Sequence, residues 1–400
     1  YRYLGDAWDD AGEPEKALDY YRKQREISGD NVYVQRRIAM LTFEAGELRS
    51  ARKEGIRLVT VDPDNAEAHY RLAVIYLRQE KPRQAQRSLE EARALGEADQ
   101  DIYYQLGTGY AALERYHEAE SAYERCVQKN PRRVEAWLGL AKMRLKAGKD
   151  SAAAGTYVHI ASFGNQAHHE LFLKAAKLFE KNGHAEQAKK AYNLYLGKGR
   201  PDQQANIRLA RLEFRDKNYD AILLLLGDPK IKETLSPADN MILAESYFAT
   251  KNYREALPLL ERAVAEKTDL TTALELAAIS AEKLGDPAKA IEMYEAYLDL
   301  DKTRRHSDYA HRVAQLYEQL GDNSAARKCY TANMKAYPRD MRNYEALARM
   351  CVEEKDWDGA REALENAVAF EHAGAELHHM LADIYERLNL KDKAIDRYKV

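Results

Sequence analysis

The 400-residue sequence has little cysteine, proline or phenylalanine, and its net charge is close to zero. Its three cysteines, Cys126, Cys329 and Cys351, are widely spaced, which excludes a disulfide scaffold and a zinc site built from cysteine pairs. With 10 prolines and 20 glycines, the chain is not collagen-like or of low complexity. A net charge of −3 excludes binding of polyanions by bulk charge. The longest apolar run, 221–226, is far shorter than the roughly 18 residues of a membrane span.

Tyrosine is abundant instead, with 27 copies against 7 phenylalanines, and many tyrosines belong to a repeated pattern. A clear copy contains Leu106, Gly107, Tyr110, Ala119 and Tyr123. Twelve copies can be aligned on the small residue of the pattern, at steps of 33 to 37 residues, most of them 34. These small residues are Gly5, Ala39, Ala73, Gly107, Ala141, Ala176, Ala210, Ala244, Ala277, Ala314, Ala348 and Ala382.

Each copy predicts a helical hairpin. Apolar residues at i, i+3, i+4 and i+7 form one helical stripe, a turn containing Gly or Asn follows, and a second stripe comes after the turn. Pro63, Pro131 and Pro338 end second helices, because proline cannot donate a backbone hydrogen bond. A single hairpin cannot bury its own apolar faces, so neighbouring copies must stack to form a continuous core.

The pattern resembles the tetratricopeptide repeat (TPR) family over essentially all 400 residues. The resemblance implies an all-α, right-handed superhelical solenoid of helix-turn-helix units, with the first helices lining a concave groove. The tryptophan typical of this family is kept only at Trp137. We predict one solenoid over 1–400, a fragment of a longer chain, with copies near 1–31, 32–65, 66–99, 100–133, 134–168, 169–202, 203–236, 237–269, 270–306, 307–340, 341–374 and 375–400.

Two copies depart from the regular spacing. The seventh is one residue short before Ala221 and continues into a leucine run that ends at Pro229. The link between the ninth and tenth copies has extra residues at 302–306. Each departure predicts either a bend in the solenoid or a surface insertion.

No catalytic or metal-binding motif is present. The sequence contains no complete phosphate-binding loop, no HExxH and no GxSxG. The pairs His168-His169 and His378-His379 are adjacent residues, which point about 100° apart on a helix and cannot chelate one ion from one face. We therefore expect no enzymatic activity, no cofactor and no metal.

The resemblance also identifies candidate binding positions, because the variable residues of the first helices face the groove in this family. One column is apolar in seven successive copies, and we expect it to line the concave wall. Its members are Tyr70, Tyr104, Leu138, Leu173, Ile207, Met241 and Leu274.

Basic residues form a second set in copies five to seven, where three pairs spaced i,i+4 each share one helix face. The pairs are Lys142/Lys146, Lys177/Lys181 and Arg211/Arg215, with Lys174 and Arg208 beside them. Residues 134–215 contain 14 Lys and Arg against 7 Asp and Glu, whereas residues 216–320 contain 13 against 19. A basic block is thus followed by an acidic one.

We interpret the chain as a non-enzymatic protein-interaction scaffold in a multiprotein assembly. Its groove would bind a protein or peptide segment that has apolar anchors and acidic groups. Alternatively, the charges keep a long solenoid soluble, or a flanking segment of the chain fills the groove. A further alternative is the recruiting region of a larger enzyme or envelope export machine. Uncapped ends, with apolar faces under Tyr3, Trp8 and Ile395, predict possible self-association.

Three known subtypes of the family do not fit. The clamp for C-terminal carboxylates needs two asparagines together in one copy, and the glycosyltransferase type has an asparagine ladder; neither is found. RNA-reading repeats have polar residues where this chain has its apolar column. Nucleic acid is disfavoured further because basic and aromatic residues are not interleaved. Cysteine usage favours the cytoplasm, and a chain that does not begin with Met leaves the periplasm open.

Overall fold

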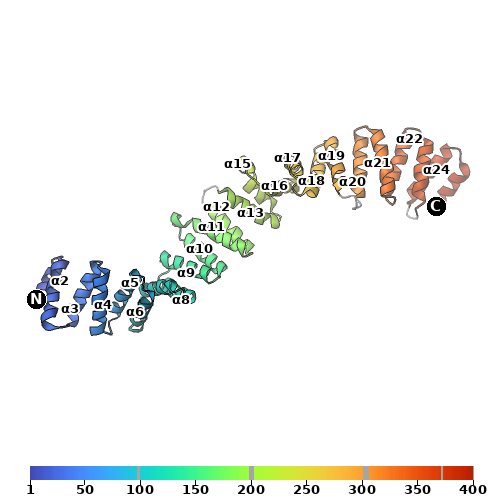
Figure 1. Ribbon diagram of the computed structural model, residues 1–400. Helices are drawn as coiled ribbons and strands as arrows, with labels where there is room; N and C mark the ends of the chain where they lie inside the picture. The colour runs from blue at the N-terminus through green and yellow to red at the C-terminus, as the bar shows by residue number, and fades with distance from the viewer. Residues whose placement is uncertain (97–99, 198–201, 301–305, 371–372, 400) are drawn as a thin grey trace. The chain divides into compact units, whose positions relative to one another are not determined.

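The computed structural model describes residues 1–96, 100–197, 202–300, 306–370 and 373–399. In these ranges it contains 25 α-helices, one 3-10 helix and no strand, which confirms the predicted all-α solenoid class (Figure 1). The chain divides into two compact units, Tyr1–Ala205 and Asn206–Val400. Residues 302–305 of the predicted insertion lie outside the described ranges.

Unit 1 contains six helix pairs, each joined by a short turn. Every helix packs against the next one along the chain, and α7 also contacts α5 and α9, so the first helices of successive pairs lie side by side. The pairs are α1 (Arg2–Asp10) with α2 (Pro14–Ser28), α3 (Val32–Glu44) with α4 (Leu48–Val61), α5 (Ala66–Arg78) with α6 (Pro82–Ala94), α7 (Gln100–Ala112) with α8 (Tyr116–Lys129), α9 (Val134–Lys146) with α10 (Asp150–Ser162), and α11 (Glu170–Lys181), preceded by η1 (Gln166–His168), with α12 (Ala185–Leu196).

Unit 2 begins within α13 (Gln203–Arg215) and continues the pairing. The irregular seventh copy has a short second helix, α14 (Tyr219–Leu226), followed by the additional α15 (Pro229–Lys232). The remaining pairs are α16 (Pro237–Ala249) with α17 (Tyr253–Ala265), α18 (Leu270–Lys283) with α19 (Pro287–Leu300), α20 (Ser307–Gln319) with α21 (Asn323–Ala336), α22 (Met341–Glu353) with α23 (Trp357–Val368), and α24 (Ala375–Arg387) with α25 (Lys391–Tyr398).

The turn inside each pair has one residue with a positive φ. These residues are Gly12, Gly46, Glu80, Glu114, Gly148, Gly183, Lys217, Lys251, Gly285, Gly321, Lys355 and Asn389. They also correct the register of the ninth copy. Gly285 follows Lys251 by one 34-residue step, so the copy aligns on Ala278, not on Ala277 as the sequence suggested.

Replacing Glu114 with glycine is expected to stabilise the protein. Glu114 has φ 58°, a left-handed conformation that costs a residue with a Cβ roughly 1–2 kcal/mol. Glycine removes this cost but loses more backbone entropy on folding, so we expect a net gain of about 0.5–1 kcal/mol. The urea midpoint should rise for Glu114→Gly and fall for Gly148→Ala, the reverse change at an equivalent turn. A lower midpoint for Glu114→Gly would show that its turn is not strained.

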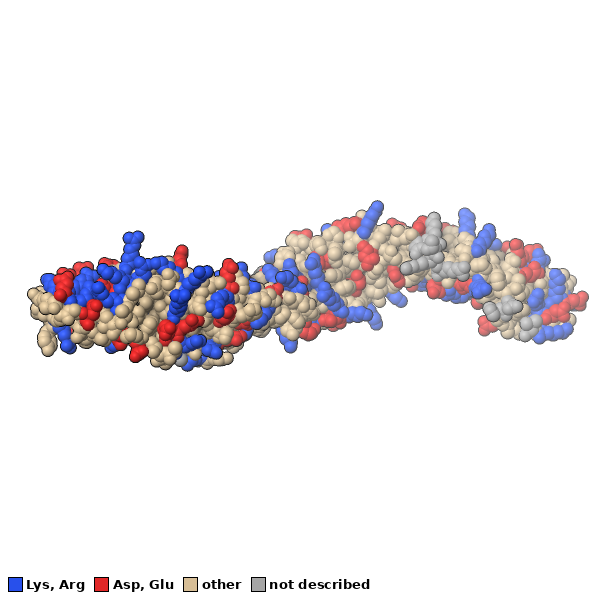
Figure 2. Space-filling model, turned by 60° about the horizontal axis from the view of Figure 1, so that its bottom comes forward, with Lys and Arg blue, Asp and Glu red and all other residues tan. Residues whose placement is uncertain are grey.

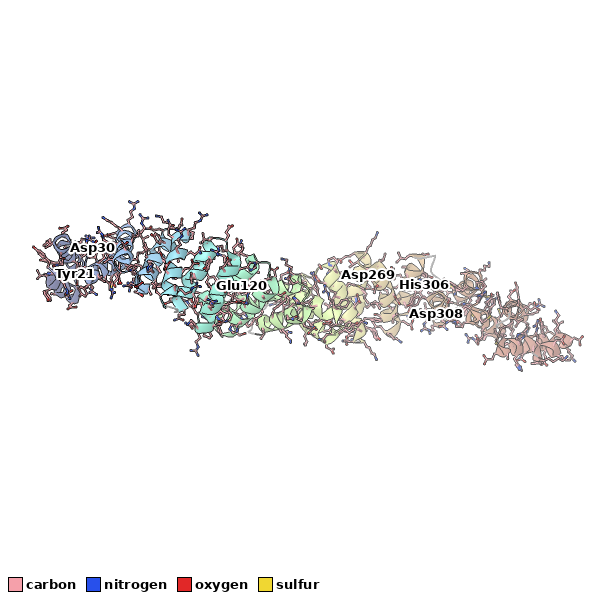
Figure 3. The ribbon with its side chains drawn as sticks, turned by 90° about the horizontal axis from the view of Figure 1, so that it is seen from below. Tyr21, Asp30, Glu120, Asp269, His306 and Asp308 are labelled. Carbon is pink, nitrogen blue, oxygen red and sulfur yellow. The ribbon has the colours of Figure 1, made fainter. Side chains whose placement is uncertain are left out.

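On most second helices a buried residue, such as Tyr21, Leu89 or Tyr123, fills the space between two consecutive first helices. We call this site the filler position; it lies four residues after the buried alanine of the repeat, as Tyr123 lies after Ala119. Several of the tyrosines at this position bond to a carboxylate on the preceding first helix. Tyr21 donates to Asp6 at 2.6 Å, and Tyr330 donates to Glu318 at 2.5 Å (Tyr21 is labelled in Figure 3). These bonds explain why the chain uses tyrosine here and not phenylalanine.

Candidate functional site

The first helix of the fifth pair, α9, has an exposed stripe of basic and apolar residues. Leu138, Lys142 and Lys146 are all exposed and spaced by four residues, whereas Leu140 and Met143 are buried. The exposed fraction of Leu138 is 37%. Within the described parts of the chain, neither Lys142 nor Lys146 makes an ion pair.

An equivalent stripe lies on α11. Lys174, Lys177 and Lys181 are exposed, and Leu173 beside them is half-buried. Lys181 pairs with Asp150 at 3.2 Å, but Lys174 and Lys177 have no ion-pair partner among the described residues. Both α9 and α11 pack on α10. Because they occupy equivalent places in successive pairs, their stripes face the same side of unit 1.

We call these two stripes the lysine face. Its residues are Leu138, Lys142, Lys146, Leu173, Lys174, Lys177 and Lys181. Figure 2 shows both Lys and Arg and Asp and Glu on the side of the molecule that it displays. The lysine face combines positive charge with exposed apolar surface, a combination that suits an acidic, partly apolar ligand.

The opposite side of α9 anchors the helix through a buried carboxylate, Glu120 of α8 (Figure 3). Glu120 accepts hydrogen bonds from Arg144 at 3.2 Å and from Lys149 at 2.8 Å. Arg144 also donates to Glu124 at 2.8 Å and to the buried Thr156 hydroxyl at 2.7 Å. Burial opposes ionisation of Glu120, but the bonds from Lys149 and Arg144 outweigh it and hold its pKa below the usual value. The basic residues on α9 therefore have two roles: Arg144 holds the helix against α8 and α10, whereas Lys142 and Lys146 are exposed to solvent.

Upstream, the predicted apolar column becomes part of the packing between helices. Tyr70 and Tyr104 are half-buried against the core around Leu106. The Tyr104 ring stacks edge-on against Tyr123 at 5.9 Å between centroids, and the Arg133 guanidinium lies 4.2 Å from its ring centre. Both tyrosines thus present only part of a ring to solvent.

In unit 2 the structure corrects part of the predicted site. Ile207 and Met241 are each 4% exposed, and Leu274 is 2% exposed, so these side chains belong to the core and do not line an open wall. Arg211 binds Asp239 through two hydrogen bonds of 2.7 and 2.9 Å, so its charge is already neutralised within the unit. The acidic partner of Arg211 thus lies in the next copy, at a different position of the repeat, so a comparison of equivalent positions could not predict it.

The other two cations of unit 2 differ in exposure. Arg208 is half-buried and already interacts within the protein, whereas Arg215 is exposed. Asp239, which holds Arg211, is buried. Burial alone would raise its pKa, but the hydrogen bonds from Arg211 and Ser236 have the larger, opposite effect, so the pKa lies below the usual value.

His169, from the first histidine pair, helps to hold the sixth helix pair together. His169 is buried and donates from Nε2 to the carbonyl oxygen of Tyr195 at 2.7 Å. Where the chain is described, no three His, Cys, Asp or Glu side chains are placed to share a metal ion. No helix in the described ranges is long and apolar enough to cross a membrane.

Comparison with known proteins identifies the repeat. Two family models, both described as tetratricopeptide repeat, match residues 100–143 and residues 36–101, 242–306 and 312–376, together more than half of the chain. The paired helices with an exposed first-helix face define a helical-repeat scaffold for protein–protein interaction. The chain belongs to the tetratricopeptide repeat family.

Several solved structures are similar in part. They include MamA from Desulfovibrio magneticus RS-1 (21% identity over 40% of this chain and 92% of that chain, TM-score 0.38). YrrB, described as a TPR protein with an unusual peptide-binding site, is 21% identical over 47% of this chain and 96% of that chain, with a TM-score of 0.40. A tetratricopeptide repeat protein from Parabacteroides merdae ATCC 43184 is 14% identical over 60% and 95%, with a TM-score of 0.38. No curated protein matches the sequence.

Proposed function

We propose that the lysine face binds an extended or helical segment of a partner protein, with acidic groups and apolar anchors, within a multiprotein assembly. One observation carries the proposal: Lys142, Lys146, Lys174 and Lys177 are exposed on adjacent first helices without an ion pair among the described residues. The apolar side chains of Leu138 and Leu173 lie beside them. Apolar contacts would supply affinity, and the lysines would steer the partner and set its register.

The proposal is confined to unit 1. Ile207, Met241 and Arg211 are excluded from it, because the first two are buried and the third is paired within unit 2. A contribution from Arg208 or Arg215 stays a prediction, as do self-association through the ends and a single solenoid of twelve copies. Each needs its own experiment.

Reversing three charges on the lysine face is expected to weaken partner binding at least about tenfold. Each exposed ion pair contributes about 0.2–1 kcal/mol, and reversal replaces attraction with repulsion. The variant is Lys142→Glu, Lys146→Glu and Lys177→Glu in one chain. Partners captured from the source lysate would be identified by mass spectrometry, and their affinities measured at two salt concentrations.

A second triple variant separates the site from net charge. Lys53→Glu, Lys190→Glu and Lys328→Glu make the same change at exposed positions of the second helices α4, α12 and α21. We expect this control to retain the partner, and we expect salt to weaken binding to the wild type more than to the lysine-face variant. If both triple variants bound the partner as tightly as the wild type does, the partner would bind at another surface.

A further inference from the structure

A pocket of about 410 Å³ opens between α3, α4 and α5 in unit 1. Its floor is formed by Gly55 and Leu58 of α4, and Leu72 and Ile75 of α5 line one wall. Met40 and Phe43 of α3, both half-buried, line the other wall. A volume of this size lies in the range of about 300–1,000 Å³ that is typical of ligand-binding pockets.

The pocket exists because its filler position is glycine. Gly55 lies two 34-residue steps before Tyr123, whose ring fills the equivalent space between α7 and α9. In the third pair, the fully buried Leu89 fills the same place. Around the pocket, a separate core cluster is formed by three small or medium-sized buried residues, Ala39, Leu58 and Ala68. The second pair thus lacks an anchor that other pairs supply from within the chain.

A side chain can be placed at this glycine if the flexible Leu72 side chain shifts by a few tenths of an ångström. A Cβ built on Gly55 would come within 3.3 Å of only one atom, the flexible Cδ1 of Leu72. The glycines that flank Tyr123 differ, since a Cβ there would lie within 3.0 Å of the ring. Glycine also weakens the interior of α4, where nearly any other residue favours the helix more. A locally unfavourable residue that leaves a cavity is expected at a functional site.

We propose that the Gly55 pocket binds an aromatic side chain from a partner protein segment, which takes the place of the missing filler. The walls suit an aromatic ring, because Phe43 offers a ring face or edge and Met40 a polarisable sulfur. Most of the charge at the rim is paired: Arg36 pairs with Asp62 at 2.9 Å and Arg71 pairs with Glu67, while the exposed Asp64 adds one negative charge. The pocket therefore selects a neutral apolar group.

The pocket opens on the same side as the lysine face. Its floor belongs to the second helix α4, so its mouth lies between the first helices α3 and α5. Its rim residue Arg36 and Leu138 of the lysine face also occupy equivalent positions, three 34-residue steps apart. The inference therefore rests on the proposed function, and it specifies that one apolar anchor of the partner segment is aromatic.

The test is the selection of random 12-residue peptides, displayed on phage, by the full chain. Wild-type protein should enrich peptides that contain a Phe, Tyr or Trp, and the synthesised peptides should bind Gly55→Leu at least tenfold more weakly. Leucine is the residue that fills the equivalent space in the third pair, so Gly55→Leu should melt at the same temperature as the wild type or higher. Should that variant fold poorly, Met40→Glu places a charge at the half-exposed mouth and should weaken the same peptides.

Two controls make the result specific. Gly155→Leu introduces the same change into α10, where a Cβ meets no atom within 4 Å, and should leave peptide binding unchanged. Lys142→Glu/Lys146→Glu/Lys177→Glu tests the lysine face in the same selection. Equal binding of the enriched peptides to wild type and Gly55→Leu, or enrichment of aliphatic peptides only, would overturn the pocket proposal and leave the lysine face standing. Aromatic peptides without acidic residues, lost only in Gly55→Leu, would support the pocket and contradict the lysine face. A library that yields no peptide would count against both.

Discussion

Replacing Gly139 with alanine is expected to destabilise the protein by about 1–3 kcal/mol through overpacking. Gly139 lies on α9 against the filler Tyr123, and a Cβ there would be 2.6 Å from the ring carbon Cζ. The ring has little room to move toward α7, because it already packs so closely against Gly107 that a Cβ built there would lie 2.8 Å from it. Alanine favours a helix over glycine by up to about 1 kcal/mol, so the overpacking cost must exceed that gain.

A mutant cycle tests the cause. Gly139→Ala should lower the urea midpoint in the wild type but raise it in Tyr123→Leu, where the ring is gone and leucine, as at Leu89, fills the space. Gly155→Ala is the matched control: it lies in a helix, meets no neighbour within 4 Å, and should stabilise. A similar effect of Gly139→Ala in both backgrounds would show that the close approach of α7, α8 and α9 is not what requires glycine.

This comparison explains how glycine has two roles in the same repeat. At 107 and 139 it makes room for a filler that the chain itself supplies. At 55 it stands in place of the filler and leaves a pocket. The sequence shows all three glycines, but only the distances around a Cβ distinguish the two roles.

The repeat period, the helix type and the turn positions could be predicted from the sequence, because small, apolar and turn-forming residues recur at the same positions in twelve copies. The register of the ninth copy was wrong by one residue, since Ala277 and Ala278 are both small and both fully buried. The turn at Gly285, with its positive φ, resolves that ambiguity. The turn residue, which needs a positive φ, therefore fixes the register of a copy better than the small residue in the first helix does.

The candidate site was harder to predict because exposure and pairing depend on neighbouring copies. Arg211 and Lys177 are equivalent in the repeat, yet among the described residues Arg211 pairs with a carboxylate of the next first helix, Asp239, and Lys177 does not. Ile207 and Leu138 share one column, but Ile207 is buried while Leu138 is exposed. The different role of Arg144 could have been predicted, because two residues from Lys142 correspond to about 200° around the helix.

Because Arg144 holds α9 in place, Arg144→Met is expected to destabilise the protein by about 1–3 kcal/mol at neutral pH. The change leaves Glu120, whose side chain is 9% exposed, with Lys149 as its ion-pair partner, and removes the hydrogen bond to the buried Thr156. The lysine stripe on the other side of the helix keeps its charges. Any loss of partner binding in this variant would therefore come from the position of α9, not from the cations that contact the ligand.

The pH dependence tests whether the carboxylates that hold Arg144, above all the buried Glu120, cause the effect. Because its pKa in the folded protein is lower than when unfolded, ionised Glu120 contributes stability above the unfolded pKa of about 4.3, and this contribution is lost as the pH falls through the folded pKa. The stability difference between wild type and Arg144→Met should accordingly be largest near neutral pH and shrink below about pH 4. Arg115→Met, which removes an exposed ion pair with Glu118 and a cation–π contact with the Tyr110 ring, is the control and should change the stability much less, with little dependence on pH. Urea midpoints at three pH values would decide, and a difference that is constant with pH would assign the effect of Arg144 to packing and not to the carboxylate.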